Sequence, residues 1–188
     1  MGRTITKEAI AAYPAEAFNG RIVEVRTTDA CEEAVTFLSG CNMLGFDTET
    51  RPTFKKGNVH GVSLIQLSTN DSCYLFRVNI IGFPPSLLRL LSNPEVLKIG
   101  LSLRDDFHSL SRRIQFTPQG FIDLQTIVKN YDIEDMSLQK IYALLFRKKI
   151  SKNQQLTNWD ADALTEPQKR YAALDAWACL KIYKELCC

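Results

Sequence analysis

Two pairs of polar side chains in this sequence are surrounded by apolar residues. Asp47 and Glu49 close an apolar run that begins at Met43, and side chains two apart in a strand leave the same face. Tyr171 and Asp175 lie four apart in an apolar stretch, so on a helix they share one face. Carboxylates in apolar surroundings need protons, counter-charges or a metal ion. Each pair is a candidate for metal chemistry, although solvated acids at a strand end would explain the first pair equally well.

A third acidic position follows a later apolar run. Asp106 comes after residues 97–100, which we expect to form a buried strand, and it opens a predicted helix with Phe107 and Leu110 on one side. An acid at a helix start is stabilised by the helix dipole and the free N–H groups, so capping alone would account for it. Asp105 is the alternative if the register differs by one residue.

The predicted elements that carry these residues alternate between strands and helices. The patterns predict strands over 21–26, 43–49, 61–67, 73–76, 97–100 and 121–123, and helices over 29–38, 85–91, 106–114, 124–130, 137–145 and 166–186. Early strands followed by strand–helix alternation are typical of an α/β domain with a mixed central β-sheet flanked by helices. We expect an N-terminal extension over residues 1–20 and one domain over residues 21–188.

The composition is that of a globular chain. Of the 188 residues, 45% are hydrophobic and 23% charged, and the net charge of +2 neither supports nor excludes a nucleic-acid partner. The sequence shows no signal peptide or membrane span, so we expect no membrane association. Six cysteines without a C-x-x-C pair argue against a zinc site. Free thiols fit a reducing compartment, and we expect an intracellular, cytoplasmic protein.

Three motifs occur in an order that resembles a known family. They are GFDTET at 45–50, KIGLSLRDDFHSL at 98–110 and LTEPQKRYAALDAWACLKIYKEL at 164–186. Together they resemble the DEDD superfamily of 3′–5′ exonucleases, tyrosine subclass, in the branch of ribonuclease D and the Werner syndrome exonuclease domain. The resemblance implies a ribonuclease H-like fold. It also implies hydrolysis of DNA or RNA from a free 3′ end, releasing nucleoside 5′-monophosphates.

The same resemblance implies a role for each motif residue. Two Mg²⁺ or Mn²⁺ ions would bind to carboxylate oxygens, as hard cations prefer. Asp47 would bridge both ions, Glu49 and Asp175 would hold the ion that activates water, and Asp106 would hold the second ion. Tyr171 would orient the attacking water.

Substrate contacts are expected next to the first motif. By resemblance, backbone N–H groups around Thr48 and Thr50 would meet the terminal sugar. Arg51, Lys55 and Lys56 form a basic loop that we expect to contact phosphate, with solvated surface as the alternative. A second basic run, with the same two interpretations, contains Arg147, Lys148, Lys149 and Lys152.

Other functions are compatible with the same fold. An exonuclease-like module that has lost activity would serve as a scaffold or clamp, but loss of a catalytic acid is the usual sign of that change, and here all the motif acids are present. A chain of 188 residues leaves no room for a helicase or polymerase, so we expect any such partner in trans. The sequence does not determine the oligomeric state.

Overall fold

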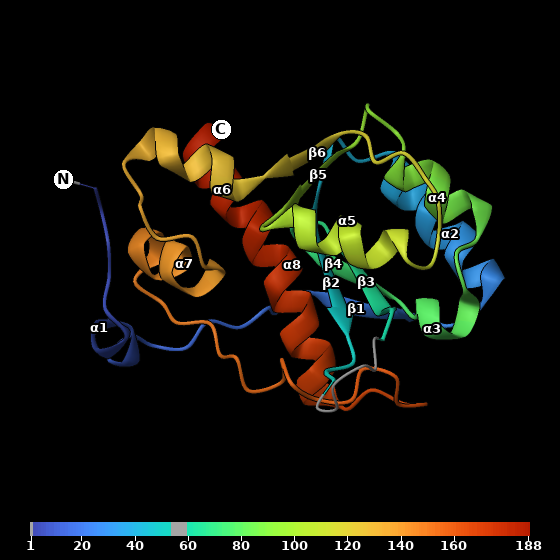
Figure 1. Ribbon diagram of the computed structural model, residues 1–188, viewed down its shortest axis with the longest axis horizontal. Coiled ribbons are helices and arrows are strands. Elements are labelled where there is room, and N and C mark those ends of the chain that lie inside the picture. The colour runs from blue at the N-terminus through green and yellow to red at the C-terminus, as the bar shows by residue number, and fades with distance from the viewer. Residues whose placement is uncertain (1, 54–59) are drawn as a thin grey trace.

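The computed structural model describes residues 2–53 and 60–188. It contains one six-stranded mixed β-sheet with helices on both faces (Figure 1), which confirms the predicted α/β class. The strands are β1 (Arg21–Val25), β2 (Met43–Thr50), β3 (Val62–Ser68), β4 (Ser72–Phe76), β5 (Leu97–Gly100) and β6 (Phe121–Asp123). The helices are α1 (Lys7–Ala11), α2 (Thr28–Ser39), α3 (Val78–Ile81), α4 (Pro85–Leu91), α5 (Leu103–Ser111), α6 (Leu124–Ile127), a 3₁₀ turn (Val128–Tyr131), α7 (Leu138–Phe146) and α8 (Glu166–Cys187).

The strand that carries the first motif lies inside the sheet. The strand order is β1-β4-β3-β2-β5-β6, so β2 pairs on both sides. It is antiparallel to β3 and parallel to β5, and a register irregularity between Glu49 and Thr50 ends the regular pairing with β3. β5 pairs with the start of β2, from Met43 to Gly45, and β3 pairs with it from Gly45 to Thr50, so neighbouring strands hold β2 along its length.

The two faces of the sheet are covered by different helices. α8 packs against β2, β3, β4 and β5 on one face, and its apolar residues form one core with Leu64, Leu75 and Ile99. On the other face α2, α4 and α5 surround a second core that includes Phe46 and Leu67. Alternate residues of β2 and β3 point into opposite cores, as the two-residue period of a strand requires.

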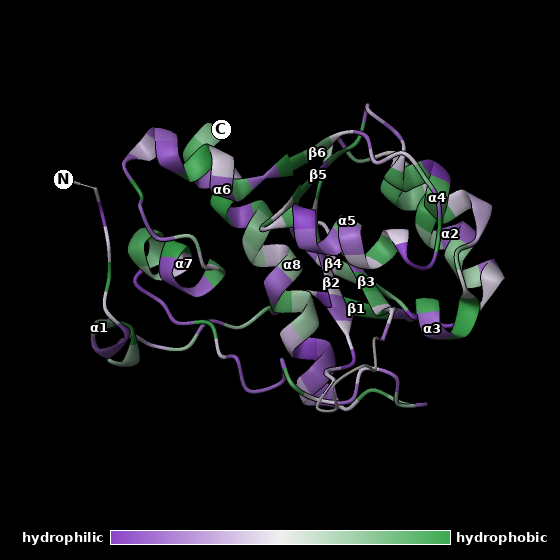
Figure 2. Ribbon diagram, viewed as in Figure 1, coloured by the Kyte–Doolittle hydropathy of each residue, from purple (hydrophilic) through white to green (hydrophobic). Residues whose placement is uncertain are grey.

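Helix α8 begins where its sequence predicts. The Thr165 side chain accepts a hydrogen bond from Gln168 N–H, the Gln168 side chain bonds back to Thr165 N–H, and Pro167 stands in the first turn. Figure 2 shows mostly hydrophilic residues along the connection from α7 to α8 and over the first turn of α8. The polar start leads into an apolar middle that crosses the sheet.

Several predicted boundaries were wrong by a few residues for identifiable reasons. Thr27 caps α2, and Asp29 lies in its first turn. α5 begins at Leu103, so Asp106 lies within its first turn and does not open it. The short helices α1 and α3 were not predicted, because one turn leaves too few residues for a periodic pattern. Within the described parts of the chain, every helix is too short or too polar to cross a membrane.

Candidate active site

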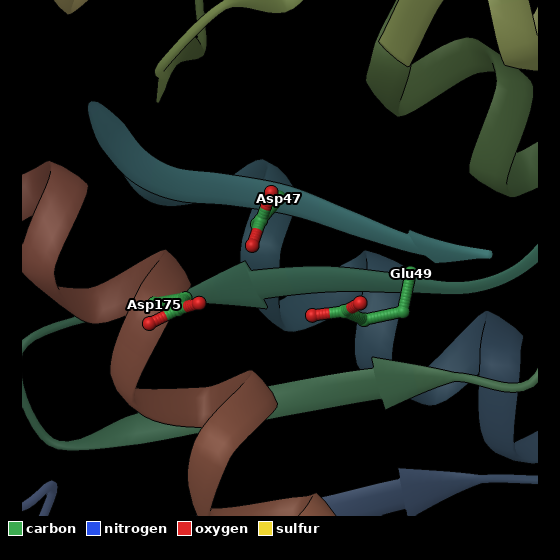
Figure 3. Close-up of side chains that lie close together, drawn as sticks. All are labelled: Asp47, Glu49 and Asp175. Carbon is green, nitrogen blue, oxygen red and sulfur yellow. The ribbon is translucent and has the colours of Figure 1, made fainter. Parts of the chain in front are cut away.

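Three carboxylates converge where β2 meets α8. Asp47 and Glu49 leave the same face of β2, and Asp175 comes from the middle of α8. Each contributes a carboxylate oxygen to a group whose members all lie within 4.8 Å of one another. Figure 3 shows the three side chains turned towards a common space. The structure thus brings together residues that are 128 positions apart in the sequence, from 47 to 175.

Gly45 explains how a helix reaches this strand so closely. A Cβ atom at this position would overlap the carbonyl oxygen of Ala176 on α8 and would lie 3.2 Å from the Leu180 side chain. Glycine is therefore required here for its small size. The contact sets the distance between β2 and α8 directly beside the three carboxylates.

Burial and mutual repulsion disturb the acids of this cluster. Burial raises the pKa of Asp47 and of Glu49 well above the ordinary carboxyl range, and the neighbouring negative charges raise both further. Burial also raises the pKa of Asp175 to about 7, although a hydrogen bond from Tyr171 and the charge of Lys152 lower it. Two or three carboxylates in this space need a positive charge to stay ionised at neutral pH.

The residues present fit a divalent cation. Asp175 is 7% exposed, and its Oδ1 atom is buried without a hydrogen-bond partner. A buried oxygen without a partner is costly unless a donor or an ion approaches it. The set contains oxygen ligands only, as Mg²⁺ and Mn²⁺ prefer. Asp47, Glu49 and Asp175 are the residues that would hold the ion.

Asp106 lies beside this cluster and outside the group of three. Its Oδ1 atom accepts a hydrogen bond of 2.5 Å from the Thr48 hydroxyl, and its charge is close enough to raise the pKa of Asp47. Burial raises the pKa of Asp106 itself to about 7. Asp105 is exposed and accepts a hydrogen bond from the Ser102 hydroxyl. Of the two adjacent acids, Asp106 is therefore the one that faces the site.

Asp123, which the sequence analysis did not single out, orients the helix that carries Asp106. Its carboxylate accepts hydrogen bonds from the backbone N–H groups of Ser102 and Leu103 at 3.1 and 2.9 Å. Ser102 adopts a left-handed conformation with φ 60°, which an L-residue adopts at a cost. An aspartate at the end of the strand 121–123 was the available signal, but its backbone partners lie 21 and 20 residues away.

Tyr171 lies on the same face of α8 as Asp175, one turn earlier. Burial and the charges of Asp175 and Glu49 raise its pKa above the ordinary tyrosine range. The fully buried Trp159 packs against its ring, with 6.1 Å between ring centroids. Gln168 holds the segment before Trp159 by donating to Thr157 Oγ1 at 3.0 Å. Trp159 is thus a core residue that fixes the ring of the tyrosine.

A cavity of about 350 Å³ opens in front of the carboxylates. Its walls come from β2, from residues 136–139 before and in α7, and from residues 150–155. Lys152 lies in the last of these segments. The cavity thus combines acids on its floor with polar and apolar side chains on its rim, as a site for one charged, partly apolar ligand requires.

The predicted substrate residues occupy different positions. Thr48 lines the cavity, whereas Thr50 is half-buried at the end of β2 and Arg51 is exposed just after it. Lys55 and Lys56 lie outside the described residues. Their predicted contact with phosphate stays a prediction.

The second basic run separates into individual roles. Lys148 Nζ bonds to Glu16 at 2.9 Å, and Lys149 Nζ donates to the Ala11 carbonyl at 2.8 Å. Arg147 ends α7 in a left-handed conformation with φ 51°. Lys152 is the member of this run that lines the cavity. Of this run, Lys152 is thus the residue placed at the cavity of the carboxylates, and phosphate contact by the run stays a prediction.

The fold and the sequence both have known relatives. The chain is 34% identical over 180 residues to the mouse bifunctional 3′–5′ exonuclease/ATP-dependent helicase WRN, covering 90% of this chain and 13% of that protein. It is 28% identical over 200 residues to a 3′–5′ exonuclease of Arabidopsis thaliana, covering 93% and 66%. It thus spans only part of these curated relatives.

Solved structures show the same arrangement of elements. The EXO domain of Aedes aegypti Nibbler superposes with a TM-score of 0.83 at 26% identity, covering 92% of this chain and 91% of that one. Escherichia coli RNase D superposes with a TM-score of 0.78 at 25% identity, covering 89% and 44%. The fold is therefore ribonuclease H-like, as the motifs predict.

A sequence model of the 3′–5′ exonuclease family matches residues 22–187, almost the whole chain. The match includes all three motifs and each carboxylate of the site. This chain belongs to the 3′–5′ exonuclease family, within the DEDD superfamily.

Proposed function

We propose that this chain is a metal-dependent 3′–5′ exonuclease of the tyrosine subclass, which releases nucleoside 5′-monophosphates from a DNA or RNA strand. The observation that carries the proposal is the convergence of Asp47, Glu49 and Asp175, with one buried oxygen of Asp175 lacking any partner. Four carboxylates in or beside one cavity are more than a structural role explains, because burial raises the pKa of each and the neighbouring acids raise those of Asp47 and Glu49 further.

The acids have distinct places in this proposal. Asp47, Glu49 and Asp175 would hold one cation, and Asp47 together with Asp106 would hold a second. Divalent cations, when bound, supply activation of water and compensation of charge on the phosphate. The Thr48 hydroxyl orients Asp106, because it donates to the Asp106 carboxylate. Family membership supports divalent-metal use, and the two-ion count is our proposal.

Tyr171 positions the attacking water in this proposal. Its raised pKa keeps the hydroxyl protonated at neutral pH, so it acts as a hydrogen-bonding group and does not serve as the base. Trp159 fixes the ring from behind. A fixed hydroxyl at the edge of the carboxylate cluster can hold a water in line with a phosphate that binds there.

A digestion experiment tests the activity, its polarity and its substrate together. The purified chain is incubated with 5′-labelled RNA, single-stranded DNA and recessed duplex DNA, in Mg²⁺, Mn²⁺ or EDTA. We expect a ladder that shortens from the 3′ end in either metal and no cleavage in EDTA. Uncut substrates in all metal conditions would support the inactive-module alternative.

Two adjacent aspartates provide a matched pair of variants for this experiment. Asp106→Asn removes the charge beside Asp47, and we expect it to abolish the ladder. Asp105→Asn removes an exposed charge one residue away, and we expect cleavage close to that of the parent. Loss of cleavage in the Asp105 variant alone would show that the assignment of Asp106 is wrong.

The mouse relative joins an exonuclease and a helicase in one protein. On that basis we propose that a helicase or a polymerase acts with this chain in trans. Co-purification of the chain with such an enzyme would check this partnership. The Asp47→Asn variant is the control for bridging of the two proteins by substrate.

A further inference from the structure

Helix α8 carries a row of cationic and aromatic side chains next to the stripe that holds Tyr171 and Asp175. Arg170, Trp177 and Lys181 are separated by seven and four residues, so they lie along one stripe of the helix. Tyr171 and Asp175 occupy the neighbouring stripe. From Arg170 to Lys181 the helix rises by about 16 Å. One rigid element thus connects the catalytic cavity to a row of cationic and aromatic side chains.

Two further hollows continue from the catalytic cavity along this stripe. Ser151 and Tyr171 line both the catalytic cavity and a second hollow of about 240 Å³, which also contains Arg170. Residues 16–18 line both this second hollow and a third one of about 630 Å³, which contains Trp177 and Lys181. Neighbouring hollows therefore share walls from the carboxylates to Lys181. A chain-like ligand that leaves the first cavity would meet the other two hollows next to it.

An ion-pair network centred on Glu16 fixes the N-terminal segment that forms these shared walls. The Glu16 carboxylate accepts hydrogen bonds from the Tyr142 hydroxyl at 2.6 Å, from Lys148 at 2.9 Å and from Lys181 at 3.2 Å. The Glu16 side chain is only 6% exposed. The adjacent Phe18 is buried against Trp177, with 5.8 Å between ring centroids. The walls of the hollows are thus part of the packed domain.

The third hollow combines positive charge with a partly exposed aromatic ring. Arg21, Lys148 and Lys181 line it together with the acids Glu16 and Asp71, so cations are in excess by one. Glu16 is shared by two lysines whose side chains stay 43% and 32% exposed. Lys181 Nζ lies 4.7 Å from the centre of the Trp177 ring. Phosphates bind to such cations, and bases stack on such rings without sequence preference.

We propose that this stripe of α8, together with the N-terminal segment, is a docking groove for the single strand of RNA or DNA that leads into the catalytic cavity. The inference rests on the proposed function and adds where the strand lies outside the catalytic cavity and that it must be long enough to reach the third hollow. An acidic peptide would use the cations alone, whereas a nucleic acid would also use the half-buried Trp177 ring, so the pairing of cations with an aromatic ring favours a nucleic acid.

Substrates of two lengths separate this groove from the catalytic cavity. A dinucleotide fits within the cavity, whereas a strand of about twelve nucleotides exceeds it and reaches the groove. We expect Trp177→Leu, which keeps an apolar side chain against Phe18, to lower kcat/KM for the longer strand roughly tenfold and to leave the dinucleotide unchanged. The Arg21→Gln, Arg170→Gln double variant should lower the slope of log KM against log salt by about 1.4. Arg89→Gln, on α4 over the opposite face of the sheet, is the matched control.

A binding measurement keeps this inference distinct from the proposed activity. Fluorescence polarisation of 5′-labelled RNA and DNA strands in EDTA reports docking without cleavage, and thermal midpoints verify that each variant is folded. Weaker binding of both strands by the groove variants supports the groove even if the parent does not cleave. Equal binding and equal length dependence in parent and variants would overturn it. A further outcome is that polyglutamate competes as strongly as an oligonucleotide while Trp177→Leu binds the strands like the parent. That result would show a general polyanion surface and would also overturn the inference.

Discussion

The acids of the site reduce the stability of the metal-free protein. The pKa of Asp175 in the fold, about 7, lies above its ordinary value near 4. The folded chain therefore binds a proton that the unfolded chain releases, and stability falls as the pH rises from about 4 through about 7. Above that range, ionised Asp175 repels Asp47 and Glu49 inside the fold. A bound cation would reverse this effect.

Asp175→Asn tests this linkage without an activity assay. At pH 8 in EDTA we expect the variant to be more stable than the parent by on the order of 2 kcal/mol, with a midpoint about 4–8 °C higher. At pH 4 the difference should disappear. Mg²⁺ should raise the midpoint of the parent more than that of the variant. Thermal denaturation over pH 4–8 measures all three, and a parent that is insensitive to Mg²⁺ would contradict the assignment of the metal site.

Tyr171→Phe removes the hydroxyl and keeps the ring that packs on Trp159. If the hydroxyl positions water, single-turnover cleavage should fall about 10²–10⁴-fold. Stabilisation by Mg²⁺ should be close to that of the parent, because the three carboxylates remain. Single-turnover rates and thermal midpoints provide the comparison. An unchanged rate in a folded variant would remove the tyrosine from the mechanism and, with it, the subclass.

At the scale of elements, the site depends on how closely β2 and α8 approach. Asp47 and Glu49 are fixed by the period of β2, and Asp175 by the period of α8, but neither period sets the distance between the two elements. The contact of Gly45 with the Ala176 carbonyl sets it. The glycine in the first motif is thus as much a part of the site as the acids that follow it.

Gly45→Ala should therefore damage both stability and activity. The added methyl group overlaps backbone on α8, which cannot rotate away, and we expect a loss of about 1–3 kcal/mol together with a large loss of cleavage. Gly40→Ala is the matched control, since a Cβ there meets only the Phe37 carbonyl at 3.4 Å and the backbone has an ordinary φ of −84°. Urea denaturation and the digestion assay compare them. An alanine at 45 that is tolerated as well as one at 40 would show that the approach is adjustable.

The sequence predicted those elements whose pattern is local. The run 97–100 became β5 without change, and α8 begins at Glu166 as expected. The start of α5 was wrong because Asp123, distant in sequence, holds its first turn. That Asp47 and Asp175 lie close together was predicted from the order of the motifs alone. The bond from Thr48 to Asp106 was not predictable, because it depends on the packing of two elements.

At the scale of the whole molecule, two clusters of titratable groups change the stability of the fold in opposite directions as the pH rises. The carboxylates beside β2 favour the fold when they are protonated. Glu16 favours it when ionised, because bonds from Tyr142 and Lys148 outweigh the effect of burial and lower its pKa to about 2. The metal-free protein should thus be most stable at moderately acid pH, where Glu16 is charged and Asp175 still holds its proton.

Glu16→Gln isolates the second of these effects. The folded pKa of Glu16, about 2, lies below its ordinary value, so its stabilisation is complete above about pH 5 and declines as the pH falls towards 2. We expect the variant to lose about 1–3 kcal/mol at pH 7, because Lys148 and Lys181 lose their shared counter-charge, and the gap to the parent should narrow as the pH falls below 4. Glu33→Gln, at an exposed position of α2, is the control and should show no such gap. Urea denaturation from pH 3 to pH 7 measures the difference. A gap that stays constant over this range would mean that Glu16 acts through its shape and neutral hydrogen bonds, and that the N-terminal segment is not held by charge.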